Sequence, residues 1–243
     1  MNEPAPRAAV EVNEPSSRAM SPEERQVAAL AFTAEHSVLM MALGGVWSAS
    51  LGRTSVFLGV LSAAGLALGF AAQAGIKPTD FVALAVVVLL VVLFLGVTTF
   101  VRLVQLQREA VVYIAGQNRI RHFFVENAPS IRPYFILPTH DDPSAMYRSV
   151  GTGMNRRPPR YPLLNMIAQT HGIVGVITGA VAAAIAGLAL NWTSPLVSWL
   201  AAAAALLLTV AVLFAYWQRS LAEIQAAIRP LSSTPADDLG APF

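Results

Sequence analysis

The 243-residue sequence contains no cysteine. Without a thiol, the chain forms no disulfide, no cysteine-ligated zinc or iron–sulfur centre and no thiol nucleophile. It also lacks a Walker loop, a nucleophile elbow, an HExxH zinc motif and a dinucleotide-binding fingerprint. These absences favour a non-enzymatic protein, for which we expect no catalytic residue and no cofactor.

Charged residues are scarce as well. They make up 12% of the chain, whereas roughly 25% is typical of soluble globular domains. Lysine occurs once, at Lys77, so the other basic residues are all arginines. Hydrophobic residues reach 55%, and the mean hydropathy is +0.57. This composition is typical of a membrane protein rather than a soluble domain.

Four long apolar runs account for that composition. They cover residues 54–74, 81–101, 166–190 and 195–217, and His171 is the ionisable residue inside them. Each run exceeds the roughly 18–20 residues that cross a bilayer core of about 30 Å. The sequence therefore predicts an all-α, polytopic membrane bundle of four transmembrane helices with a small cytoplasmic helical domain. The spans form two hairpins, within residues 51–104 and 163–217.

The arginines predict the orientation of these spans. Nine arginines lie between the second and third runs: Arg102, Arg108, Arg119, Arg121, Arg132, Arg148, Arg156, Arg157 and Arg160. The loop between the third and fourth runs has none. Because cytoplasmic loops retain the excess of lysine and arginine, this middle segment and both termini are expected in the cytoplasm.

The rest of the chain divides into four segments. We expect a disordered leader at 1–20, an interfacial or cytoplasmic amphipathic helix at 21–50, a cytoplasmic stalk helix and proline- and arginine-rich loop at 105–162, and a helix extension with a disordered tail at 218–243. Ser21-Pro22-Glu23-Glu24 is typical of a capped helix start.

Residues 27–47 are apolar enough to be considered as a fifth span. Glu35 and His36 lie near their middle, and a charge at a helix centre costs about 2.5–3.5 kcal/mol on insertion scales. We therefore interpret this segment as an interfacial or cytoplasmic helix, which Gly44, Gly45 and Gly52 loosen before the membrane is entered. Glu35 is expected to pair with an arginine of the stalk such as Arg102 or Arg108.

Small residues at a spacing of four mark two faces for helix packing. Gly65 and Gly69 lie in the first span, and Gly175 and Gly179 lie in the third. Such faces allow close approach of two helix backbones in lipid. Packing within the four spans is the favoured interpretation, and a homo-oligomer is the alternative.

Polar residues near the cytoplasmic ends of the second and third spans suggest a polar vestibule, formed by Thr98, Thr99, Gln169, Thr170 and His171. An ionisable side chain within a span is a functional candidate. An oligomeric channel or pore-forming effector is therefore an alternative function.

A second alternative is a metal-dependent membrane enzyme. His122 and Glu126 are four residues apart on the predicted stalk helix, and His140 and Asp141 follow in the loop. Zinc sites need three or four ligands, and the pair on the helix supplies only two. The four residues are therefore weak metal candidates, and we expect no bound metal.

The basic cluster Arg156, Arg157 and Arg160 precedes the third span. Such a cluster attracts anionic lipid headgroups. It lacks interleaved aromatic residues, so we do not expect nucleic-acid binding.

Several short strings resemble an uncharacterised, mostly actinobacterial family of four-span membrane proteins. They are Thr33-Ala34-Glu35-His36, Phe100-Val101-Arg102-Leu103-Val104, Gly116-Gln117-Asn118-Arg119-Ile120-Arg121, Pro133-Tyr134-Phe135 and His140-Asp141-Asp142. The resemblance implies a bacterial plasma membrane protein and assigns no catalytic residue. Our leading hypothesis is a protein whose cytoplasmic helices bind or scaffold a partner protein, or couple a cytoplasmic signal to the spans.

Overall fold

The structure is a computed structural model that describes residues 20–149, 169–190 and 192–233. Most of the predicted leader, the cluster of Arg156, Arg157 and Arg160, and the last ten residues lie outside these ranges. The described elements are α1 (Pro22–Gln73), α2 (Pro78–Asn127), η1 (Pro129–Tyr134), α3 (Pro143–Ser149), α5 (Thr170–Ala189) and α6 (Pro195–Ala227).

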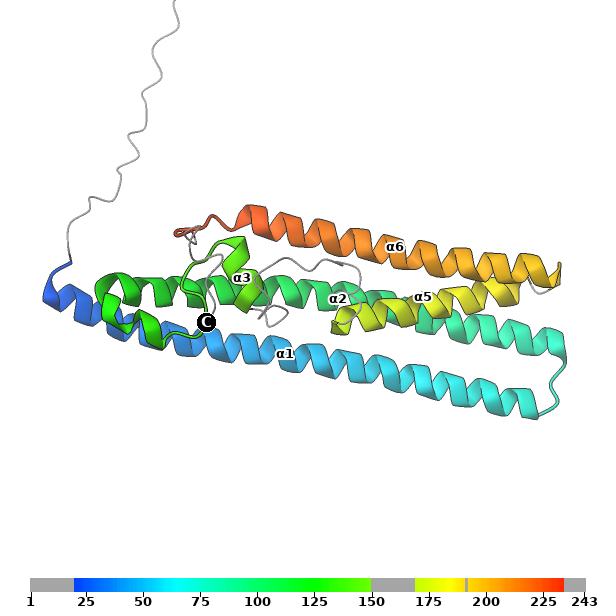
Figure 1. Ribbon diagram of the computed structural model, residues 1–243. Helices are drawn as coiled ribbons and strands as arrows, with labels where there is room; N and C mark the ends of the chain where they lie inside the picture. Colours follow the sequence, from blue (N-terminus) through cyan, green and yellow to red (C-terminus); the bar gives the residue numbers. More distant parts are fainter. Residues whose placement is uncertain (1–19, 150–168, 191, 234–243) are drawn as a thin grey trace, which may run out of the picture.

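Four of these helices, α1, α2, α5 and α6, are long and apolar enough to cross a membrane. The chain is therefore an all-α, multi-pass membrane protein with four candidate spans, as the four apolar runs predict. The turn at 74–77, the end of α5 and the start of α6 lie at the same end of the bundle (Figure 1). Gly75 lies in this turn with a φ of 70°, a left-handed conformation that glycine adopts without strain.

The helices differ greatly in length. α5 has 20 residues, which span about 30 Å and match a bilayer core. α1 has 52 residues and α2 has 50, so each extends for about 75 Å or more. Consequently α1, α2 and α6 continue past the start of α5 (Figure 1). We call this continuation the stalk: residues 22–49 of α1, 105–127 of α2 and 218–227 of α6, together with η1 and α3.

The start of α1 agrees with its predicted cap. The Ser21 hydroxyl accepts a hydrogen bond from the Glu24 amide at 3.1 Å, and the Glu24 carboxylate accepts one from the Ser21 amide at 2.7 Å. The predicted loosening at the glycines is wrong, because α1 is continuous through Gly44, Gly45 and Gly52. Helix propensity costs only about 1 kcal/mol per glycine, and packing along α2 offsets that cost.

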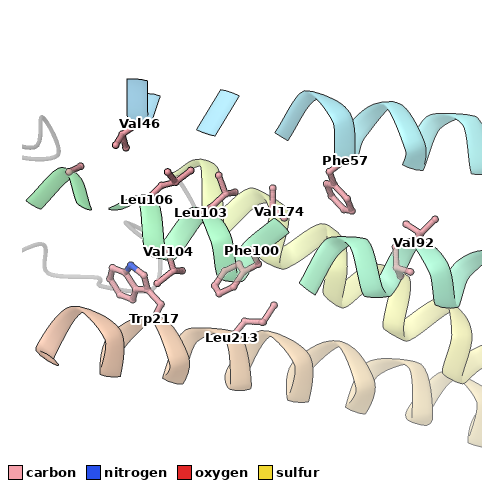
Figure 2. Close-up of a cluster of buried hydrophobic side chains, with 12 residues drawn as sticks. Val46, Phe57, Val92, Phe100, Leu103, Val104, Leu106, Val174, Leu213 and Trp217 are labelled. Atoms are coloured by element: carbon pink, nitrogen blue, oxygen red, sulfur yellow. The ribbon is translucent and has the colours of Figure 1, made fainter. Parts of the chain in front are cut away.

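α2 is the central helix of the bundle. Its neighbours α1 and α6 lie on opposite sides of it, and α5 crosses α2 and packs against both α2 and α6 (Figure 1). The core runs along this contact and contains the fully buried Phe100 and Val174, with Phe57, Leu213 and Trp217 around them (Figure 2). Because each span has few buried positions, most of its remaining apolar surface faces outward, as lipid allows.

Glycines permit the closest helix contacts. A Cβ at Gly96 would lie 2.5 Å from the Thr178 hydroxyl oxygen, and one at Gly175 would lie 3.0 Å from the Phe100 ring. Gly179 packs in the same way against Leu206 and Val210 of α6. A Cβ at Gly65 or Gly69, by contrast, would meet no neighbouring atom within 4 Å. The α5 pair therefore packs inside the bundle, whereas the α1 pair faces outward.

The contact at Gly96 yields a stability prediction. Gly96→Val should destabilise the protein by roughly 1–3 kcal/mol, because the added carbons overpack the contact with Thr178 and Phe57. Gly44→Val is the matched control, since Gly44 lies in a long helix, is exposed and has open space around it. Unfolding in a denaturing detergent, followed by circular dichroism, measures both variants. Equal destabilisation of the two would contradict the packing described.

Candidate functional site

A cleft of about 460 Å³ lies where α5 begins. Residues 46–51 of α1, 103–110 of α2 and 169–171 contribute to its lining. Its polar lining side chains are Ser50, Gln107, Gln169, Thr170 and His171, and the rest are apolar or aromatic. We call it the interfacial cleft, because it lies at the end of the α5 span and at the base of the stalk.

His171 is the most buried polar side chain of the interfacial cleft, with 5% of its surface exposed. Its ring stacks on Trp217 at a centroid distance of 5.7 Å and meets the edge of Phe100 at 6.1 Å. Its Nε2 atom has no hydrogen-bond partner among the described residues. A buried polar atom without a partner costs about 1–3 kcal/mol, so this nitrogen is a position at which a ligand would be stabilised.

Gln107 fixes the polar end of the interfacial cleft. Its side-chain oxygen accepts a hydrogen bond from Trp217 Nε1 at 2.9 Å, and its amide nitrogen donates to the Gln169 oxygen at 3.3 Å. One side chain of α2 thereby joins α6 to the residue that caps α5. Gln107 is not among the residues that the sequence predicts for the polar vestibule. Its signal was an uncharged polar residue among the apolar positions at Leu103, Leu106 and Ala110.

The predicted vestibule is only partly assembled. Gln169, Thr170 and His171 line the interfacial cleft, but Thr98 and Thr99 do not. Thr98 is exposed and donates to the carbonyls of Phe94 and Leu95 in its own helix, both at 3.0 Å. Thr99 is buried against the neighbouring helices. The two threonines therefore contribute to helix surface and packing.

The weak metal candidates are also brought together in part. The His122 and His140 rings are 5.1 Å apart, and His122 Nε2 is 3.6 Å from a Glu126 carboxylate oxygen. Asp141 is engaged elsewhere, with Arg119 and with the segment after α6. In the described part of the chain, no three histidine, aspartate or glutamate side chains converge as a metal site.

Asp141 instead holds two parts of the stalk together. Its fully buried carboxylate accepts hydrogen bonds from Arg119 Nε at 2.6 Å, from the Leu231 amide at 3.0 Å and from the Ser232 amide at 2.9 Å. Burial alone would raise the pKa of Asp141, but these hydrogen bonds outweigh it and hold the pKa below the usual aspartate value. The carboxylate thus ties the segment after α6 to α2.

A second buried charge lies nearby on α2. The Arg121 guanidinium donates to the side-chain oxygens of Asn118 at 2.6 Å and Gln117 at 3.4 Å. Burial lowers the pKa of Arg121, although arginine stays protonated in proteins. Asn118 also donates to the His140 carbonyl at 2.9 Å. These side chains connect the α2 part of the stalk to the segment before α3.

The charged residues at the base of the stalk pair with one another. Arg102 binds Glu109 at 3.2 Å, and Arg108 binds Glu223 of α6 at 3.6 Å. The expectation that Glu35 pairs with Arg102 or Arg108 is therefore wrong. Glu35 lies on α1 at a level further along the stalk, where α1 faces the later turns of α2.

A larger groove of about 730 Å³ runs along the stalk. α1 contributes Phe32 and Leu39, α2 contributes Val112 and Ile120, and the segment after α6 contributes Leu231. Exposed Glu35 and Arg229 also line it, from α1 and from the segment after α6. We call it the stalk groove. Its apolar lining with charges on two walls is suited to an amphipathic segment.

Comparison of the chain with protein-family models, with curated proteins and with solved structures finds no match in any of the three. No family is therefore identified for the chain, and its membrane class rests on its four long apolar helices.

The Asp141 network yields a prediction. Asp141→Asn should increase hydrogen exchange at the Leu231 and Ser232 amides and lower stability by roughly 1–3 kcal/mol, because a charged acceptor of both amides is lost. Glu223→Gln, which removes an exposed ion pair, is the control and should change stability by less than about 1 kcal/mol.

The lowered pKa fixes the sign of the pH dependence. Stabilisation by Asp141 is fully present above its unfolded pKa of about 4 and is lost as the pH falls through its lower folded pKa. Exchange and thermal melting of the wild type should therefore report a weaker stalk in acid, whereas Asp141→Asn should lack this component. Unchanged amide protection in Asp141→Asn would contradict the assignment.

Proposed function

We propose that this multi-pass membrane protein is non-enzymatic and binds a partner protein through its stalk on the cytoplasmic side of a bacterial plasma membrane. The orientation is supported by the nine arginines between the second and third apolar runs, since cytoplasmic loops retain such residues. The lack of catalytic sequence motifs supports a binding role.

The stalk groove is the observation that carries this proposal. It lies beyond the α5 level, on helices that are more than twice as long as a bilayer core. Val112 and Leu231 expose much of their apolar surface in it. Lipid does not cover such a surface outside the membrane, and exposed apolar surface in water is typical of a protein-binding site.

The occupant that we propose is an amphipathic helix of a cytoplasmic protein. Such a helix buries an apolar face in the groove and leaves its polar face in water. Glu35 on one wall and Arg229 on another favour a helix with a basic residue near the first and an acidic residue near the second. These exposed charges contribute mainly to orientation and association rate.

The outer face of α1 favours self-association as well. Small residues alternate along it at spacings of three and four, and they are exposed: Gly45, Ser48, Gly52, Ser55, Gly59 and Ser62. Gly45, Gly52 and Gly59 have open space around them. Spacing of this kind suits a closely packed, left-handed pair of helices. In the stalk the same face continues with Val38 and Met41, the latter 72% exposed.

Site-specific photo-crosslinking in native membranes tests the proposal. A crosslinking residue at Val112, in the stalk groove, should capture one heterologous protein, whereas the same residue at Val38 should capture a second copy of this chain. The purified heterologous protein should then bind the reconstituted wild type. Leu231→Gln should weaken that binding about tenfold, because a leucine loses roughly 1.5 kcal/mol or more of apolar burial.

Leu30→Gln is the matched control, since it makes the same substitution at an exposed leucine of the stalk outside the groove, and binding of the heterologous protein should be unaffected. Leu231 is 77% exposed, so its substitution leaves the core intact. Capture at Val112 of nothing but the chain itself, or equal weakening by both glutamine variants, would refute the groove as the partner site.

A further inference from the structure

The interfacial cleft holds a hydrogen-bonding site that the proposed partner binding does not use. It is separate from the stalk groove and shares no lining residue with it. His171 Nε2 is buried and lacks a partner among the described residues. At 460 Å³ the interfacial cleft is within the range of small-molecule sites, about 300–1,000 Å³.

Hydrogen-bond donors dominate the start of α5. The first amides of a helix have no acceptor within that helix, and the first accepting carbonyl of α5, at Gln169, is taken by the Ile173 amide. The Gln169 side-chain oxygen accepts from Gln107, so its amide nitrogen is the group left to donate. The Thr170 hydroxyl adds a further donor beside His171. A ligand with carbonyl or hydroxyl oxygens matches these groups.

The ligand headgroup should carry no net charge. None of the side chains that line the interfacial cleft is lysine, arginine, aspartate or glutamate. The nearest arginines on α2 are already paired, Arg102 with Glu109 and Arg108 with Glu223. A phosphate headgroup would lose its water without gaining a cationic partner from the lining of the cleft, which is costly at a partly buried site.

The rest of the ligand should be apolar. Trp47 and Leu51 at the cleft are 60% and 63% exposed on α1, at the level where the α5 span starts. Tryptophan is enriched at membrane–water interfaces, so this side of the interfacial cleft faces the lipid boundary. A headgroup inside it could keep its chain in the surrounding bilayer.

We propose that the interfacial cleft binds the uncharged, carbonyl-bearing headgroup of a membrane amphiphile, with His171, Gln169 and Thr170 as its hydrogen-bonding residues. Two kinds of membrane molecule have this chemistry, an isoprenoid quinone and a diacylglycerol. Trp217 and Gln107 act as positioning residues, because Trp217 stacks on the His171 ring and Gln107 orients Gln169.

Native mass spectrometry of the full chain in nanodiscs tests this site. The probes are a decyl-substituted benzoquinone, dioctanoylglycerol and, as the anionic comparison, a short-chain phosphatidylglycerol. We expect one saturable adduct per chain with at least one neutral probe. His171→Leu should weaken it about tenfold, the loss of roughly one buried hydrogen bond. Thr98→Val, a change on the exposed side of α2, should leave it unaltered.

A second variant separates binding from folding. Ser50→Leu fills the interfacial cleft from α1 and leaves the stacking of His171 on Trp217 in place, so it should also weaken the adduct. Binding of the quinone alone or of the diacylglycerol alone supports the site and identifies its headgroup, and mutual competition supports the shared carbonyl chemistry. Absence of a neutral adduct, displacement by phosphatidylglycerol at equal concentration, or unchanged binding in Ser50→Leu would overturn the proposal.

Discussion

The mismatch between helix length and bilayer thickness governs the rest of this structure. α2 continues for 50 residues, about 75 Å, whereas a bilayer core is about 30 Å thick. One helix must therefore pack in lipid along one half and in water along the other. In its first half, residues 81–101 carry no charged side chain and bury small or aromatic residues such as Gly96 and Phe100 against other helices. In its second half it buries one stripe and carries Gln117, Asn118 and Arg121 into a polar network.

Continuous helices connect the candidate spans directly to the stalk. α1, α2 and α6 enter the stalk as continuous helices. The interfacial cleft lies at the junction, where Gln107 joins α5 and α6 to α2. A partner in the stalk groove and an amphiphile in the interfacial cleft would thus contact the same two helices, α1 and α2. We propose that this shared pair of helices would allow a signal to be coupled between stalk and spans.

The sequence predicts the parts of this fold that depend on local patterns. Four apolar runs predict the four candidate spans, and the Ser21 cap predicts the start of α1. Local patterns do not predict which helices pack together. Gly44 and Gly52 predict a weakened helix, but α1 is continuous through both because it packs along α2. His171 and Gln107 are 64 positions apart in the sequence, and only the packing of α5 on α2 brings them to one cleft.

We propose that all four long helices cross the membrane and that the stalk lies in the cytoplasm. The cysteine-free sequence makes this directly measurable with single cysteines at Thr193, in the connection between α5 and α6, and at Ser130, in the stalk; both positions are exposed. Intact cells are treated with a membrane-impermeant maleimide. The account predicts labelling at Thr193→Cys in intact cells and labelling at Ser130→Cys only after lysis. Labelling of Ser130→Cys in intact cells would contradict it, because the stalk would then face outward.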